Sequence, residues 1–112
     1  MSHVKTINKL EETWHSISEF CAKLAENQWK SPTQLPNWSV QDNLSHLIAF
    51  EANFQGIPRP QHTAADKSHV KNELGSSNED DVDVRRSLTG AEVLAEWNEI
   101  TMLRLHALRS AD

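Results

Sequence analysis

Six histidines in a chain of 112 residues raise the question of a metal site, because neutral imidazole is the commonest metal ligand in proteins. His46 follows Leu44 and precedes Leu47 and Ile48, at the flank of an apolar helical face. An imidazole in this place can bind a metal ion, or it can be a hydrogen-bonded residue of a packed helix. The neighbouring residues alone leave both interpretations open and favour the second.

The other residues that could add to a site are scattered along the chain. Glu51 lies on the same face as His46, where an unpaired carboxylate is costly unless the helix end is wet or a cation meets it. Glu99 and His106 are two helical turns apart and are expected to be a solvated surface pair. His62 and His69 fall in a long polar segment that gives them no orientation. Because no HExxH, HxxxH or CxxC pattern occurs, the sequence has no self-contained metal motif.

Nucleophilic chemistry finds no support in the sequence. There is neither a GxSxG elbow nor a glycine loop that could hold a phosphate. The single cysteine, Cys21, lies on an apolar stripe and is expected to be a small buried residue. His3 and His15 are expected to face solvent. The four tryptophans are expected to be core or lid residues: Trp14, Trp29, Trp38 and Trp97.

Composition narrows the class of protein and its partners. The chain has room for one domain, residues 1–112, and its 38% hydrophobic content is modest for a soluble protein. A formal net charge of -5 argues against nucleic acid and against membrane surfaces as partners. The sequence has no apolar run of transmembrane length and no signal-peptide core, so we expect a cytoplasmic protein.

Apolar residues at alternating spacings of three and four predict helices that position these side chains. The first is predicted over Val4–Asn27, and a connection with two prolines follows it over Lys30–Asn37. Ser39 and Asp42 then form a helix-start signal, and the second helix is expected to end near Phe54.

The second half of the chain is predicted to contain a loop and two helices. A long polar loop spans Ile57–Ser77, and it either covers a site or is partly disordered. A short helix is predicted from a cap at Ser76 through Ser87, and a long one begins at Gly90 after the capping pair Thr89 and Glu92. No strand pattern of useful length appears. The predicted class is therefore all-α, an up-down bundle of three long helices and a short one.

Three segments carry a resemblance to a known family. The most specific is W-S/T-V-x-D-x-x-x-H-L, which matches Trp38 to Leu47, and the NELG segment and the R-R-S-x-x-G segment support it. With them the chain resembles the N-terminal half of the mycothiol-dependent maleylpyruvate isomerase family, within the wider DinB-like superfamily. The resemblance runs from the first helix to the end of the sequence.

This resemblance implies a four-helix bundle that holds one divalent metal ion, usually zinc, at its open end. The motif histidine is a metal ligand in the family and matches His46. A low-molecular-weight thiol such as mycothiol is expected to bind at the metal, where it becomes the nucleophile for isomerisation or transfer.

The remaining family ligands lie in a later part of the domain than Asp112, so we expect an incomplete catalytic site in this chain. An incomplete bundle leaves an apolar groove that a second copy can cover, and we therefore expect a homo-oligomer, a dimer in the simplest case. The alternative function is a catalytically silent helical module for self-association, in which His46 serves only packing.

Overall fold

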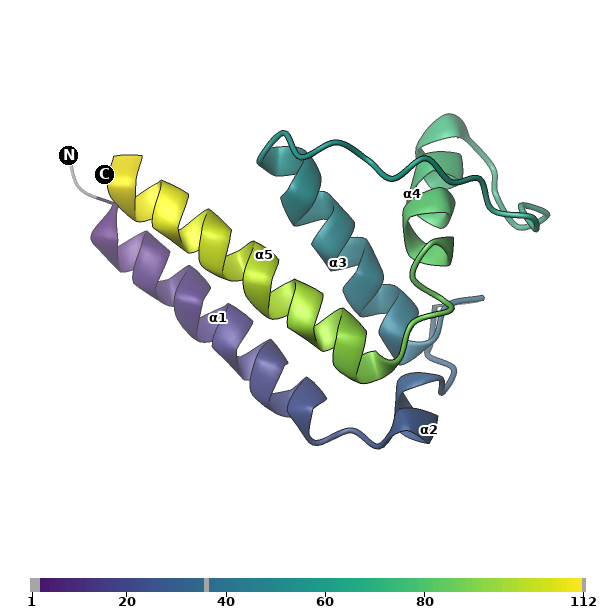
Figure 1. Ribbon diagram of the computed structural model, residues 1–112, viewed down its shortest axis with the longest axis horizontal. Helices are drawn as coiled ribbons and strands as arrows, with labels where there is room; N and C mark the ends of the chain where they lie inside the picture. The colour runs from purple at the N-terminus through teal and green to yellow at the C-terminus, as the bar shows by residue number, and fades with distance from the viewer. Residues whose placement is uncertain (1–2, 36, 112) are drawn as a thin grey trace.

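The computed structural model describes residues 3–35 and 37–111, and the regular elements in these ranges are helices. They are α1 (Val4–Ala22), α2 (Glu26–Trp29), α3 (Val40–Phe54), α4 (Glu73–Asp83) and α5 (Gly90–Ala111). The long helices α1, α5 and α3 lie side by side in that order, and α4 lies beyond α3 (Figure 1). The predicted all-α bundle of three long helices and a short one is confirmed, with the four-residue α2 in addition.

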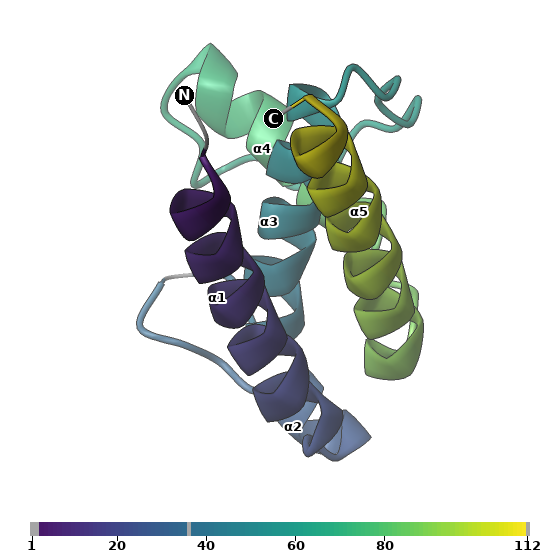
Figure 2. The same ribbon diagram turned by 90° about the vertical axis from the view of Figure 1, so that its left-hand side faces the viewer.

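The helices pack pairwise and leave one side of the bundle open. Helix α5 packs against both α1 and α3, and α3 packs in turn against α4, whereas α1 and α3 share no packed pair in the described chain. Seen from the side, α1 and α3 lie to the same side of α5 (Figure 2). On the side away from α5, no other described helix packs against both α1 and α3.

The core follows the predicted apolar stripes. On α1 the side chains of Ile7, Trp14 and Cys21 are buried. Trp14 meets Trp97 of α5 edge to face, with ring centroids 6.3 Å apart. Burial raises the pKa of the Cys21 thiol, which suits the predicted role of a small core residue. On α3 and α5 the inner positions are Leu44, Ile48, Val93, Trp97 and Ile100.

Two predicted helix starts are confirmed by their hydrogen bonds. The Asp42 amide donates to the Ser39 hydroxyl over 3.1 Å, and the Ser39 amide donates to the Asp42 carboxylate over 3.0 Å. Thr89 and Glu92 form the same reciprocal pair at 3.1 and 3.0 Å. Each pair satisfies amides that have no partner within the helix.

Three predicted helix boundaries were wrong. Helix α1 ends at Ala22 and not at Asn27, because the chain turns there and begins the separate α2 at Glu26. Helix α4 begins at Glu73, one turn before the predicted cap at Ser76, and it ends at Asp83 and not at Ser87. The cap is Asn72, whose side-chain oxygen accepts the Gly75 amide over 2.7 Å. An asparagine is as good a cap as serine, and here it starts the helix first.

The chain exposes more surface than a compact protein of its mass. Its accessible surface is 7436 Å² for 12.7 kDa, whereas a compact monomer of that mass exposes about 6,200 Å². The predicted inner positions Leu47, Phe54 and Leu103 are 39%, 66% and 46% exposed, because the apolar stripes of α3 and α5 continue beyond the core. Among the described residues, no helix combines the length and apolar character that crossing a membrane requires.

Candidate functional site at the start of α3

His46 lies two turns into α3 and packs against Trp38, which precedes the helix. The two ring centroids are 5.2 Å apart with an angle of 43° between the planes. His46 is half-buried, and its Nδ1 atom is buried without a hydrogen-bond partner. The contact with Trp38 fixes where the imidazole lies, while its buried nitrogen is left free to accept or to coordinate.

Trp38 is held in turn by a buried carboxylate of α4. Its indole Nε1–H donates to Oε1 of Glu79 over 3.3 Å. Glu79 is only 1% exposed, and Nη2 of Arg86 donates hydrogen bonds of 3.0 Å to both of its carboxylate oxygens. His69 Nε2 lies 3.1 Å from the same Oε1 atom. Glu79 therefore joins three side chains that lie far apart in the sequence.

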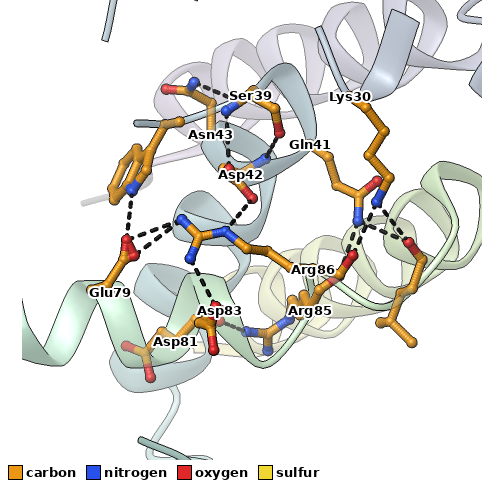
Figure 3. Close-up of polar contacts among 12 residues, drawn as sticks. Lys30, Ser39, Gln41, Asp42, Asn43, Glu79, Asp81, Asp83, Arg85 and Arg86 are labelled. Atoms are coloured by element: carbon orange, nitrogen blue, oxygen red, sulfur yellow. Dashed lines mark hydrogen bonds and ion pairs between the residues drawn. The ribbon is translucent and has the colours of Figure 1, made fainter. Parts of the chain in front are cut away.

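The guanidinium of Arg86 neutralises this group of carboxylates. It lies between Glu79, Asp42 and Asp83, at 3.3 Å from Asp42 and 2.8 Å from Asp83 (Figure 3). Burial by itself lowers the pKa of Arg86, but the hydrogen bonds to Glu79 and Asp83 and the charge of Asp42 outweigh it and raise that pKa. Asp42 is also the capping carboxylate of α3, so Arg86 ties the start of α3 to α4.

The chain that leaves α4 is fixed against the same end of α3. Gln41 donates from Nε2 to the carbonyls of Arg85 and Leu88 over 2.9 and 3.0 Å. Lys30 donates to the carbonyls of Arg86 and Leu88 over 3.1 and 3.0 Å. These donors satisfy carbonyls beyond the helix end, which have no helical partner, and they hold Arg86 in place (Figure 3).

A cavity of about 330 Å³ lies beside Trp38. Three segments form it: the connection before α3, the end of the segment between α3 and α4, and the first turns of α4. The side chains that line it include Leu35, Trp38, His69, Val70, Asn78 and Glu79. The cavity thus combines an indole and aliphatic groups with amide and carboxylate groups, as small-molecule sites do.

The described residues do not by themselves fit a metal ion. Within residues 3–35 and 37–111, no group of three or more His, Cys, Asp or Glu side chains is arranged to hold one. A catalytic zinc needs about three protein ligands, of which His46 would supply one. The unpaired Nδ1 of His46 suits a ligand, but its companions would have to come from elsewhere.

The other candidate residues are not brought to His46. Glu51 forms an ion pair with Arg104 of α5. This is one of the two situations in which the sequence allowed a carboxylate on that face. Glu99 and His106 are exposed, and His106 borders a different cavity, between α1 and α5. His62 and His69 do have an orientation, contrary to expectation, since each is hydrogen-bonded to a carboxylate of α4.

Sequence reasoning missed the pair of Glu79 and Arg86. Glu79 lies three residues after Ser76 and so fits the predicted cap there, but Asn72 caps the helix in the structure. The sequence does place Glu79 seven residues before Arg86 on an acidic helix. Asp80, Asp81 and Asp83 on the same helix are equally good candidate partners for the arginine. Spacing alone could not show that Arg86 pairs with Glu79 and Asp83 and not with the others.

Comparison with known proteins gives one family. The family model of the mycothiol maleylpyruvate isomerase N-terminal domain matches residues 10–112. No curated protein and no solved structure matches the chain. The matched range includes all of α2 to α5 as well as the Trp38, His46 and Glu79 side chains described above.

Proposed function

Because the chain belongs to the mycothiol maleylpyruvate isomerase N-terminal domain family, we propose that it is a DinB-like helical domain related to thiol-dependent isomerases and transferases. In this proposal His46 is its ligand position for a divalent metal ion, with zinc the first choice. The observation that carries it is the half-buried imidazole beside Trp38 whose buried Nδ1 has no partner, next to charged side chains that are paired.

The proposal includes an incomplete site. His46 supplies one ligand, and about two more must come from a second chain. The proposed cofactor is a low-molecular-weight thiol, and the name of the family suggests mycothiol. The chain by itself is then a domain that contributes to a site and not a competent enzyme.

Replacing His46 with alanine is expected to reduce the zinc content of the protein from near-stoichiometric to background. The reason is that no group of His, Cys, Asp or Glu side chains among the described residues could hold the ion without His46. Metal content is measured by mass spectrometry on protein purified without chelator and reconstituted with Zn²⁺. Circular dichroism checks that the variant is folded.

His106→Ala is the matched control for this experiment, since it removes an exposed histidine far from Trp38 and should leave the zinc content unchanged. Full zinc content in the folded His46→Ala protein would contradict the proposed ligand. So would a parent protein that binds no zinc on reconstitution.

A second candidate function, a module for self-association, is favoured by the open side of the bundle. There α1 and α5 border a cavity of about 340 Å³ lined mainly by Ile7, Leu10, Leu108 and Arg104. The Arg104 guanidinium stands 4.2 Å above the ring of Phe54, which links this cavity to α3. Phe50 and Phe54 are 54% and 66% exposed beside it. An exposed apolar face of this kind marks a docking surface, and the proposed partner is a second copy.

Leu47→Glu is expected to weaken the dimer at least about tenfold, which corresponds to about 1.4 kcal/mol of binding free energy. Leu47 lies one turn before Phe50 and two turns before Phe54 on α3, so a charge there would be buried in the interface without a partner. The measurement is the dimer dissociation constant from light scattering during size-exclusion chromatography. Leu74→Glu is the control, because Leu74 is 72% exposed at the start of α4, away from this face.

A monodisperse monomer of the parent chain would overturn self-association. The two candidates separate in one further way, because His46→Ala should remove zinc and leave the dimer intact, whereas Leu47→Glu acts on the dimer directly.

A further inference from the structure

Residues 57–70, here called the strap, are irregular in structure but are attached to α4 by charged side chains. Arg59 starts the series: its Nε and Nη2 atoms donate to Oδ1 of Asp81 over 3.1 and 2.9 Å. Its Nη2 also donates to the carbonyl of Ser77 over 2.8 Å. The Asp81 side chain is 7% exposed, and its ion pair is with Arg59 of the strap.

The middle of the strap continues the series. Lys67 lies 2.9 Å from Asp80, and His62 lies 2.7 Å from Asp83. Between them the Ala64 amide donates to the Asp80 carboxylate over 2.8 Å. Ala64 is 6% exposed and is the one buried side chain of the strap. The contacts of Asp80 with Ala64 and then Lys67 lower its pKa, so this carboxylate is charged at neutral pH.

The end of the strap reaches the group that holds Trp38. His69 lies 3.1 Å from the Glu79 oxygen that also accepts the Trp38 indole N–H. His69 and Val70 form a wall of the cavity beside Trp38. When the end of the strap leaves α4, that wall is removed.

The forces that hold the strap are individually small. Exposed or partly exposed ion pairs contribute about 0–1 kcal/mol each. In the pairs of His62 and Lys67 both side chains are at least 21% exposed. In the pair of Arg59 with Asp81 the arginine is 42% exposed. Ala64 is the strap's one buried apolar side chain, and it contributes only a methyl group to the packing against α4. A segment with few apolar contacts opens locally at a lower free energy than the core does.

We propose that the strap is a lid over the cavity beside Trp38, that its ion pairs with α4 hold it closed, and that it opens while the helices stay folded. Opening admits small molecules from solvent to the Trp38 face of the cavity. This inference is independent of whether His46 binds metal. It concerns how small molecules reach the cavity beside Trp38, which the proposed function does not address.

The Ala64 amide is a specific reporter of the lid, because its hydrogen-bond acceptor is a side chain of α4. The double variant Arg59→Met, Lys67→Met removes two strap cations and leaves the Asp80 acceptor in place. We expect native-state hydrogen exchange at Ala64 to accelerate at least about tenfold, while the amides of Val93 and Trp97 in the core of α5 keep their rates. Lys5→Met, at an exposed lysine of α1, is the control and should leave Ala64 unchanged.

Access to the cavity is measured by acrylamide quenching of Trp38 fluorescence, taken as the difference between each protein and its Trp38→Phe counterpart. We expect the quenching constant to rise in the double variant. Exchange at Ala64 that matches the core amides in every protein would overturn the inference, because the strap would then open only with global unfolding. Faster exchange at Ala64 without increased quenching of Trp38 would overturn the lid role.

Discussion

Replacing Arg86 with alanine is expected to lower the free energy of unfolding by about 3–5 kcal/mol. The substitution leaves the carboxylate of Glu79, which is 1% exposed, without its cation. It also leaves Asp42, whose side chain is 8% exposed, without the partner that ties α3 to α4. An uncompensated charge in a buried position is among the most costly single changes to a fold.

Two further variants identify the cause of this loss. Arg109→Ala removes the same side chain from a pair with Glu11 whose members are 40% and 55% exposed, and it should cost less than about 1 kcal/mol. Adding Glu79→Gln to Arg86→Ala removes the buried charge and should recover part of the stability. Urea unfolding gives each free energy. A double variant no more stable than Arg86→Ala would show that the unpaired Glu79 is not the cause.

The helices could be predicted because their information is local. The stripe of α1 and the capping pairs at Ser39 and Thr89 lie within a few residues of the structure that they specify, and the structure has them as predicted. The break between α1 and α2 was not predicted. We attribute the break to a tertiary contact, because Trp29 packs against the start of α5. No residue near Ala22 indicates that contact in the sequence.

The candidate site divides in the same way. The motif around Trp38 and His46 lies in one segment and could be read from it, and the structure places the two rings together. The contact that fixes Trp38 joins residues 41 positions apart. Its carboxylate belongs to an acidic helix in which only the tertiary structure, which the sequence does not show, brings Glu79 to Trp38. The strap was open to two interpretations for the same reason, because its cations find partners only once α4 has folded beside them.

Glu79 connects features that the sequence presents separately. It accepts from Trp38, which packs on His46, it pairs with Arg86, which meets the cap of α3, and it takes the last contact of the strap. A change at Glu79 should therefore alter the ring environment of Trp38 and the opening of the strap together. Variants of Arg59 and Lys67 should change the strap and leave the helix cap intact.

Gly90→Ala is expected to destabilise the protein by about 3 kcal/mol, near the upper end of what overpacking costs. A Cβ atom at this position would lie 2.2 Å from two ring atoms of Trp29, a side chain that is itself 2% exposed. Glu26 restricts the junction further, because its carboxylate accepts the Gly90 amide over 2.8 Å. Neither the ring nor the start of α5 has room to move aside.

The sign of this effect distinguishes steric conflict from ordinary helix preference. In an open helix alanine is more favourable than glycine by up to about 1 kcal/mol, so a loss must come from the contact with Trp29. Gly56→Ala is the control: nothing lies within 4 Å of its added Cβ, and only its φ of 74° opposes the change, which should cost about 1 kcal/mol.

A double-mutant cycle with Trp29→Leu completes the test, because a smaller side chain leaves space for the new methyl group. The loss in the double variant should be smaller than the sum of the two single losses by at least about 1 kcal/mol. Thermal and urea unfolding of the four proteins provide the free energies. Additive losses would mean that Gly90 is required for its backbone, and the packing of α2 on α5 would then not be what excludes a side chain there.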